Sequence, residues 1–453
     1  MKRPVGKNLV AAAVSMVLAT TASAETLTDT LVATYRSSGL IDQNRAVLRA
    51  ADEDAAQAVA ALRPVFSYIA SSTYVDNVQG SSTTTSLGLN GEMLLYDFGR
   101  SQLSLDTAKE TVLATRAALV DVENSVLFSA VSAFQSVRLA QASVELRENN
   151  VRLLNEQLRA TRDRFEVGEV TRTDVSLAEA RLAAARSALA AERGGLDRAR
   201  EQYRTVVGTY PGVLGPAPAM PSIPATEAEA REVARRENPA LTQVQHQVKA
   251  AELGVEIAAR ATRPSLNASG GISVNQDGDE SANLGISLSG PIYQGGAISS
   301  RLRQAQARRD QARAQLYTAG FQVDQEVGNA YANLAVAIAR INASRQEVQA
   351  AELALRGVRE ELQLGARTTL DVLDQEQDVL DARTNLVSAE VDRIVAAYQV
   401  LDAIGLMTAE NLRLNVPIYD PAAYYNSVID APRGSVSKQG AALDRVLRSL
   451  GKE

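Results

Sequence analysis

Cysteine is absent from this 453-residue chain, tryptophan is absent as well, and histidine occurs once. Without cysteine there is neither a disulfide nor a thiolate metal ligand, so stability must come from burial and side-chain pairing. Aromatic residues make up only 4% of the chain, which favours helices packed through small side chains over a thick globular core. The single histidine, His246, has no metal-ligand companion nearby in the sequence, and we expect it on the surface.

The charge balance and the motif content exclude several functional classes. The formal net charge is −6, which gives no reason to expect a nucleic-acid partner. We find no nucleophile–base constellation, no phosphate-binding loop and no dinucleotide fingerprint, and the glycine-rich runs fall in expected strands or turns. These observations argue against an enzyme, and we expect no catalytic residue, no metal site and no cofactor.

The N-terminus has the pattern of an export signal. Basic residues precede an apolar run over residues 9–20, and Ala22-Ser23-Ala24 is a small-residue cleavage site. This pattern predicts a secretory signal peptide over residues 1–24. An uncleaved membrane anchor is the alternative, but the run is short for a span, and no later stretch approaches about 18 consecutive apolar residues.

Glycines and aspartates recur at a fixed separation along the chain. The numbers of Gly168 and Gly365 differ by 197, and so do those of Asp174 and Asp371. The same offset relates Gly99 to Gly296 and Gly208 to Gly405. Such an offset indicates an internal duplication. We predict a first repeat over residues 25–208, a proline-rich linker over 209–225, a second repeat over 226–405, and a C-terminal tail over 406–453.

Long helices dominate the expected structure of both repeats. Residues 101–166 contain neither glycine nor proline, and their apolar residues recur at three- and four-residue steps. A helix of that length would span about 100 Å. Glycine then interrupts the pattern and a second helix runs back, which predicts a long helical hairpin over about 100–208 and another over about 297–405. The other expected helical segments are 25–62, 225–261 and a short one at 441–450.

Four segments alternate between apolar and polar residues, which is the pattern of half-buried strands. They form two expected β-hairpins, over about 65–97 and about 265–294, with polar loops at 77–84 and 275–282. Strands of about ten residues with one apolar face, in an exported chain, are typical of a bilayer β-barrel. Four strands cannot close a barrel, and lipid does not tolerate open edges, so other copies must complete the sheet. A soluble sheet covered on its apolar face is the alternative.

The chain leaves the two expected hairpins through Leu95-Tyr96-Asp97-Phe98-Gly99 and Pro291-Ile292-Tyr293-Gln294-Gly295-Gly296. Together with the turns at Gly168 and Gly365, these strand exits resemble the TolC family of outer-membrane efflux and type I secretion channels. The resemblance covers about residues 25–407. It implies a mainly α fold in which duplicated antiparallel helical hairpins form an α-barrel tunnel. Four strands per chain would contribute to a 12-stranded barrel shared by a homotrimer.

The resemblance also implies a location and partners. The protein would sit in the outer-membrane lipid of a Gram-negative bacterium, with a long periplasmic portion. There it would bind a periplasmic adaptor and an inner-membrane pump of the RND or ABC type. The residues themselves are also compatible with two other classes of protein. An exported trimeric coiled-coil adhesin would explain the helices but not the strands, and a periplasmic adaptor would need compact β-rich domains.

Four aspartates lie on one face of the last long helix. Their spacing places them within about 80° of one another around the helix axis, and no basic residue is interleaved. At the 197-residue offset, the first repeat has Asp174, Leu177, Arg181 and Ala184, so the acidic stripe belongs to the second repeat alone. The alternative to a functional role is an ordinary solvent-exposed helix face, although like charges at these spacings repel. The stripe consists of Asp371, Asp374, Asp378 and Asp381.

The family resemblance implies roles for several residues near the two glycine turns. Asp371 and Asp374 match aspartate rings that narrow the periplasmic mouth, and we hypothesise that Asp378 and Asp381 extend this acidic lining. Arg367 resembles an arginine that latches the closed mouth, with Thr173 and Asp174 as its polar partners. The family has a tyrosine where this chain has Leu362, which removes one hydrogen bond from that latch. The expected adaptor-docking turns are Val167-Gly168, followed by the atypical Glu169, and Leu364-Gly365, whose glycines also suit helix C-caps.

Overall fold

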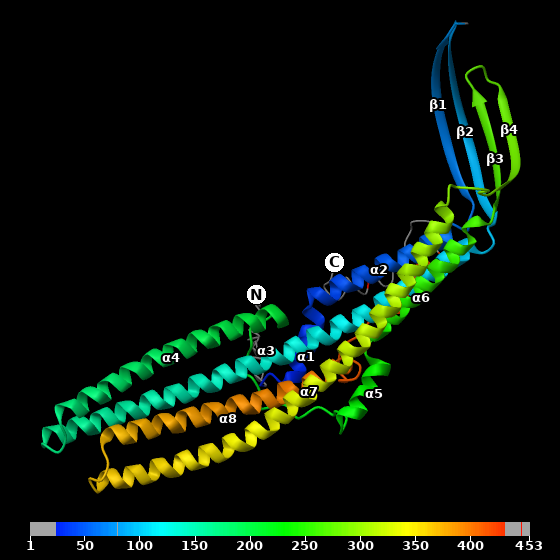
Figure 1. Cartoon of the computed structure of the whole chain (residues 1–453). Coiled ribbons are helices and arrows are strands. Elements are labelled where there is room, and N and C mark those ends of the chain that lie inside the picture. The colour runs from blue at the N-terminus through cyan, green and yellow to red at the C-terminus, as the bar shows by residue number, and fades with distance from the viewer. Residues whose placement is uncertain (1–23, 79, 431–444, 446–453) are drawn as a thin grey trace, which may run out of the picture.

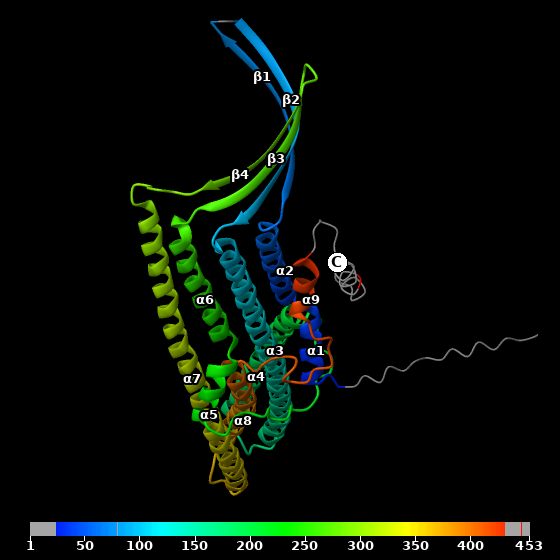
Figure 2. The same cartoon turned by 90° about the vertical axis from the view of Figure 1, so that its right-hand side faces the viewer.

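The computed structural model describes residues 24–78, 80–430 and 445. The molecule is elongated, with a long helical body and a curved β-sheet at one end (Figures 1 and 2). Apart from residue 24, the expected signal peptide lies outside the described residues. So does the expected helix at 441–450, apart from residue 445.

The same order of elements occurs in both halves of the chain: two shorter helices, two strands, and two long helices. The first half has α1 (Leu27–Ser37), α2 (Gly39–Ala60), α3 (Arg100–Glu166) and α4 (Arg172–Val207). The second half has α5 (Glu227–Glu237), α6 (Pro239–Ala259), a 3₁₀ turn (Arg260–Thr262), α7 (Ala297–Gln363) and α8 (Thr369–Ala403), and α9 (Pro421–Val428) follows.

Each expected helical segment at the start of a half is divided into two helices. Ser38 ends α1 and caps α2, accepting a hydrogen bond from the backbone N–H of Ile41 at 3.3 Å. Asn238 ends α5 and accepts from the N–H of Ala240 at 2.9 Å, while Pro239 opens α6. Both capping residues have extended backbone. A side chain that satisfies the first free N–H groups starts a new helix, and the apolar periodicity does not record the break.

The long helices form two antiparallel hairpins, α3 with α4 and α7 with α8 (Figure 1). Gly168 and Gly365 adopt left-handed backbone at the turns, with φ of +80° and +77°. The main core lies where all eight helices from α1 to α8 meet the segment after α8, around residues such as the fully buried Phe134. Helix α3 is long and apolar enough to span a bilayer by composition alone, but half of that stretch is buried inside the protein.

The strands form one antiparallel sheet in the order β1-β2-β3-β4. The two hairpins therefore pair through β2 and β3, and β1 and β4 are the edges. The prediction of a loop over residues 77–84 is wrong, because β2 already begins at Gly80, which pairs with Asn77. The Ser/Thr run after Gly80 extends the strand pairing instead, since threonine suits strands. The second hairpin, expected to run to about residue 294, ends instead at Ser289, before Pro291, which lacks an N–H donor. The strands are β1 (Val65–Asn77), β2 (Gly80–Tyr96), β3 (Ser265–Asn275) and β4 (Glu280–Ser289).

The described part of the C-terminal tail packs against the helical body. Leu414 is buried in the main core, and α9 lies on α2. The hydroxyl of Tyr424 donates to Glu53 at 2.7 Å. The guanidinium of Arg45 lies 5.0 Å from the ring centre of Tyr419, a cation–π contact between α2 and the tail. These contacts fix the segment after α8 across the middle of the molecule.

Beneath this segment, α2 carries a carboxyl group in an unfavourable setting. Asp52 is fully buried, and neither of its carboxylate oxygens has a hydrogen-bond partner among the residues that the structure describes. Burial raises the pKa of Asp52 to about 6; the nearby Arg116 opposes that rise, and Glu53 adds to it. Because the folded state holds this proton more tightly than the unfolded state does, the contribution of Asp52 to stability falls as the pH rises from about 4 to above 6.

We predict that Asp52→Asn raises the melting temperature at pH 7.5 and changes it little at pH 4.5. The neutral amide removes a buried charge whose shift of about two pKa units corresponds to at most about 3 kcal/mol. Thermal unfolding of the detergent-solubilised protein at the two pH values measures the effect. Asp54→Asn, which removes an exposed carboxylate from the same helix, is the matched control. A lower melting temperature for Asp52→Asn at both pH values would contradict the prediction.

Candidate functional site

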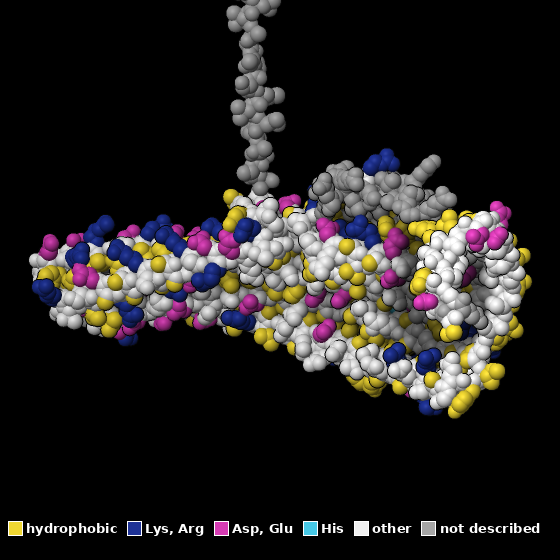
Figure 3. Space-filling model, turned by 90° about the horizontal axis from the view of Figure 1, so that it is seen from above, with side chains coloured by type: hydrophobic (Ala, Val, Ile, Leu, Met, Phe, Trp, Pro, Cys, Tyr) yellow, Lys and Arg dark blue, Asp and Glu magenta, His cyan; other side chains and the backbone are white. Residues whose placement is uncertain are grey.

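One face of the sheet is apolar and exposed along all four strands. Leu89 of β2 lies opposite Tyr68 of β1 and Ile272 of β3, so all three side chains share this face. Tyr68 is 79% exposed and Leu284 of β4 is 91% exposed. At the sheet end of Figure 3, hydrophobic side chains lie along the outer rim. The large side chains on this face include Phe66, Tyr68, Tyr74, Leu87, Leu89, Met93, Leu266, Ile272, Val274, Leu284, Ile286 and Leu288.

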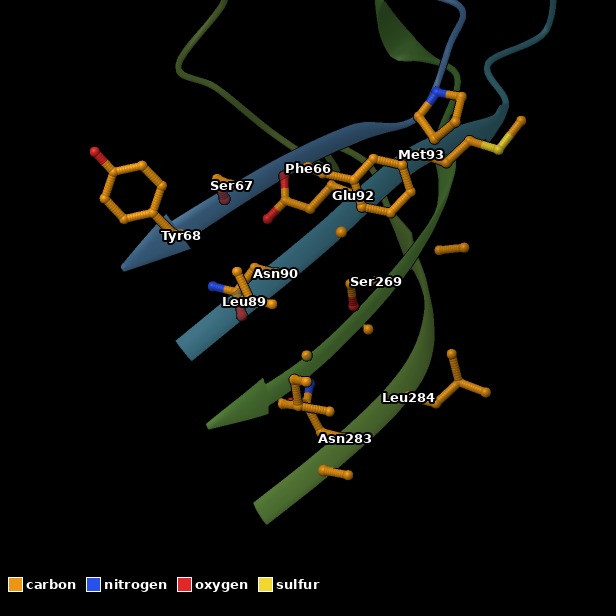
Figure 4. Close-up of a pocket in the computed structure, with 17 residues that line it drawn as sticks. Phe66, Ser67, Tyr68, Leu89, Asn90, Glu92, Met93, Ser269, Asn283 and Leu284 are labelled. Carbon is orange, nitrogen blue, oxygen red and sulfur yellow. The ribbon is translucent and has the colours of Figure 1, made fainter. Parts of the chain in front are cut away.

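The opposite face is mainly polar, although Val65, Ile69 and Val75 of β1 also lie on it. The hydroxyls of Ser71 and Ser86 are 2.9 Å apart across β1 and β2. Asn90 of β2 and Asn283 of β4 (labelled in Figure 4) both lie opposite Gly271. A Cβ on Gly271 would come within 2.6 Å of the Oδ1 of Asn90 and 2.9 Å of that of Asn283. The glycine therefore lets two amide side chains approach each other on this face. The predicted alternation of apolar and polar faces is present in the structure.

The sheet is open at both sides. Each of β1 and β4 pairs with one neighbour only, so a row of backbone N–H and C=O groups faces outward from each edge strand. An exposed edge of this length is a template for pairing with another strand.

At the opposite end of the molecule, the two hairpin turns present apolar side chains to solvent. Val167 is 72% exposed and Leu364 is 84% exposed. The left-handed Gly168 and Gly365 terminate α3 and α7. The structure thus places the four residues expected to dock an adaptor at exposed helix ends.

Two carboxylates near these turns cap helices. The backbone N–H and the hydroxyl of Thr368 donate to Asp371 at 2.8 and 2.9 Å. Thr171 and Asp174 make the same capping box at the start of α4. The hydrogen bonds from Thr368 hold the pKa of Asp371 below its ordinary value. Both aspartates that the 197-residue offset relates therefore have a local structural role.

The other three aspartates of the stripe lie on the exposed side of α8. The guanidinium of Arg181 in α4 donates to Asp374, so this carboxylate has a basic partner from the other helical hairpin. Asp381 accepts from the amide of Gln377 at 2.9 Å, and Asp378 is exposed. The apolar side of α8, expected opposite the stripe, is buried: Val372, Leu373, Val379 and Leu380.

The residues assigned to a latch have other contacts within one chain. The Nε of Arg367 donates to Glu361 at 2.8 Å, and this hydrogen bond and charge raise the pKa of Arg367. Thr173 is exposed, and Asp174 caps its own helix. Leu362, which stands where the family has a tyrosine, packs beside a small cluster that includes Val372.

Sequence reasoning missed several charged groups. Glu376 is 4% exposed on the apolar side of α8 and pairs with Arg359 at 3.0 Å; burial raises its pKa. The sequence did contain a signal for Glu376, because this charged residue lies on the apolar side of α8. Burial, with the nearby Asp121 and Glu326, also raises the pKa of Asp402 to about 6.

The lone histidine is less exposed than expected. The Nδ1 of His246 in α6 lies 2.7 Å from a carboxylate oxygen of Glu110 in α3, and both side chains are about one-fifth exposed. The histidine therefore joins helices from the two halves. Among the described residues, no group of three His, Cys, Asp or Glu side chains is placed to hold a metal ion.

Comparison with known proteins gives one consistent result. The family model for outer membrane efflux proteins matches residues 37–209 and again residues 230–406. The chain is 35% identical over 439 residues to the outer membrane efflux protein BepC of Brucella suis biovar 1 (strain 1330), covering 94% of this chain and 96% of BepC. It is 27% identical over 405 residues to the outer membrane protein TolC of Escherichia coli (strain K12), covering 80% of each chain.

Solved structures show the same fold. The outer membrane protein VceC of Vibrio cholerae superposes with a TM-score of 0.74 at 22% identity, covering 84% of this chain and 96% of VceC. The open-state MtrE outer membrane channel of Neisseria gonorrhoeae gives 0.73 at 20% identity, covering 85% of this chain and 90% of MtrE. The chain therefore belongs to the outer membrane efflux protein family, and it is a TolC-type channel of the Gram-negative outer membrane.

Proposed function

We propose that three copies of this chain form the outer-membrane exit duct of a tripartite efflux or type I secretion system. The four strands of each copy would complete a 12-stranded barrel in the outer membrane. The helical hairpins would form a periplasmic tunnel that binds a periplasmic adaptor and an inner-membrane pump of the RND or ABC type. Substrates would pass from the pump to the outside through this duct.

The open, amphipathic sheet carries the proposal. Its apolar face is exposed along all four strands and suits lipid, while its polar face suits a water-filled lumen. The hydrocarbon core offers no hydrogen-bond partners to the edges of β1 and β4, so a neighbouring copy must pair with them. A coiled-coil adhesin would account for the helices but leaves this sheet unexplained.

The relatives include both secretion and efflux proteins. The alkaline protease secretion protein AprF of Pseudomonas aeruginosa is 27% identical over 302 residues, covering 64% of this chain and 63% of AprF. The higher identity to the efflux protein BepC, over nearly the full chain, supports efflux as the first assignment for this duct.

We predict that cysteines on the two edge strands link copies into a closed trimer. The natural chain contains no cysteine, so every disulfide is an introduced one. Ser71→Cys on β1 would be combined in turn with Ser281→Cys, Asn283→Cys and Ser287→Cys on β4, which samples the register between copies. Oxidation and denaturing electrophoresis should give, for one pair, a ladder that ends at three chains.

The control places both cysteines within one copy. Ser71 lies opposite Ser86, so Ser71→Cys/Ser86→Cys should close an internal disulfide and give no ladder. A ladder that continues past three chains, or none from any β1–β4 pair in folded protein, would overturn the trimeric barrel.

We also propose that the end of the molecule where α8 begins, opposite the sheet, is the narrow, acidic mouth of the tunnel. Asp371 and Asp374 would form its constriction, and Asp378 and Asp381 would extend the acidic lining inward. All four side chains lie on the side of α8 away from its buried apolar residues. The exposed apolar tips Val167-Gly168 and Leu364-Gly365 would bind the adaptor.

We predict that Asp371→Ala/Asp374→Ala lowers the cation preference of single-channel current in a planar bilayer and weakens block by a multivalent cation. Carboxylates at a constriction attract cations, and their removal lowers local cation occupancy. Asp378→Ala/Asp381→Ala should weaken the block less. Thr368→Ala is the matched control, because it removes the hydroxyl of the α8 cap and keeps all four carboxylates. If ion preference and block stay unchanged in the Asp371/Asp374 variant, the constriction lies elsewhere.

We predict that Arg367→Ser raises conductance, as expected if Arg367 latches the mouth to a neighbouring copy. In the single chain this arginine pairs with Glu361, so the latch would require it to reach a second partner across the interface, such as Thr173 or Asp174. Glu361→Gln tests the two contacts of Arg367 separately. It breaks the ion pair with Glu361 within one copy and leaves Arg367 able to contact the neighbouring copy. Equal conductance of Arg367→Ser and wild type would rule out the latch.

A further inference from the structure

One ion pair joins the two long helical hairpins near their free ends. Arg181 of α4 donates to Asp374 of α8, and these residues are 193 positions apart. Neighbouring ion pairs lie within a single hairpin. Arg162 pairs with Glu179 across α3 and α4, and Arg383 pairs with Glu352 across α7 and α8. The pair therefore brings a base from the first half onto the acidic face of the second.

Apolar packing sets the position of this pair. Leu373, the neighbour of Asp374, is 3% exposed and lies in one cluster with Ala178 and Leu182 of α4. Arg181 directly precedes Leu182. Both charged side chains are about half-exposed, 43% for Arg181 and 54% for Asp374. An exposed pair of this kind adds little stability, so its consequence is electrostatic: a positive charge is held beside the stripe.

The internal duplication allows Arg181 to be compared with the equivalent position of the second repeat. At the offset of 197 residues, Arg181 occupies the position that Asp378 has in the second repeat. The first repeat thus carries a base where the second carries an acid. Helices α4 and α8 contact each other, and there Arg181 pairs with Asp374, whose counterpart in the first repeat is Leu177.

The charges around the stripe are unevenly compensated. Asp371 is held ionised mainly by its hydrogen bonds from Thr368, with a smaller effect of Arg367, which is itself paired with Glu361. Within the described part of the chain, Asp381 accepts a hydrogen bond from the neutral amide of Gln377 and has no basic partner. Of the four stripe aspartates, Asp374 is the one that contacts a guanidinium of a described residue.

We propose that Arg181 is a specificity-determining residue of the channel, which sets the ion preference of the acidic mouth by compensating the charge of Asp374. This inference rests on the proposed position of Asp374 at the constriction. Three copies would bring three guanidinium groups to the three Asp374 carboxylates. The mouth is then less attractive to cations, and less strongly blocked by them, than its aspartates alone would make it.

The test is the single-channel current of Arg181→Gln. In water, removing one unit charge at about 6 Å from an ion changes its occupancy about three-fold. Arg181→Gln should therefore raise the cation-to-anion permeability ratio about three-fold or more, and tighten block by trivalent hexaamminecobalt(III) about thirty-fold, because the energy scales with the charge of the ion. Arg162→Gln is the matched control, since it removes a guanidinium from an equivalent exposed pair that lacks contact with the stripe. Arg181→Lys should retain wild-type preference.

A second variant separates charge compensation from a purely structural clasp. Asp374→Asn should lower the cation preference, opposite in direction to Arg181→Gln, whereas loss of a clasp would shift both variants in the same direction, because either change breaks the same pair. A shift of the cation preference in the same direction in Asp374→Asn and Arg181→Gln would overturn the inference. So would a current altered by Asp374→Asn but not by Arg181→Gln. Absence of current from every folded variant, wild type included, would instead count against the proposed channel itself.

Discussion

The unpaired edges of an amphipathic sheet are the constraint on which the rest of this structure depends. Strands β1 and β4 each leave a row of backbone N–H and C=O groups without strand partners, next to a face whose large side chains are exposed. In hydrocarbon, no solvent can satisfy those groups. On our proposal, strands from other copies complete the sheet, and the helices that follow each strand pair gather around a common axis. The elongated shape of one chain suits a place in such an assembly.

One core in the middle of the molecule, with helix caps and small apolar clusters towards the tips, holds the helical body together. The main core is confined to the middle of the molecule, where the shorter helices and the C-terminal segment pack across the long ones. Towards the tips only small apolar clusters remain, around Leu182 and Val372. There, matching capping boxes start α4 and α8. Asp371 thus serves both the local stability of a helix and, on our proposal, the charge of the mouth.

Duplication followed by divergence explains how charge is distributed at this end. The capping aspartates Asp174 and Asp371 are common to both repeats, because each return helix needs the same start. The rest of the stripe is not shared. The second repeat adds carboxylates, and the first repeat supplies Arg181, which contacts one of them. The two halves of one chain therefore contribute opposite charges to one surface.

Much of the fold was readable from local patterns. Residues 101–166 contain no glycine or proline, Gly168 and Gly365 mark turns, and strict alternation marks the two faces of the strands. Each of these signals acts over a few residues, so neighbouring positions suffice to define it. The strand limits were less accurate, because the Ser/Thr run after Gly80 suits a loop and an extended hairpin equally well. The apolar period continues across the breaks at Ser38 and Asn238, and only Asn238-Pro239 carries a recognisable helix start signal within its segment.

The sequence by itself therefore determined the helical hairpins, the amphipathic strands and the acidic face of α8. Only the tertiary structure decided which charges meet. Arg181 and Asp374 are 193 residues apart and contact each other because Leu373 packs against α4. Asp52 looks like an ordinary polar helix residue until the body of the protein buries it. Such pairings depend on how distant helices pack, and no local periodicity encodes the choice of partner.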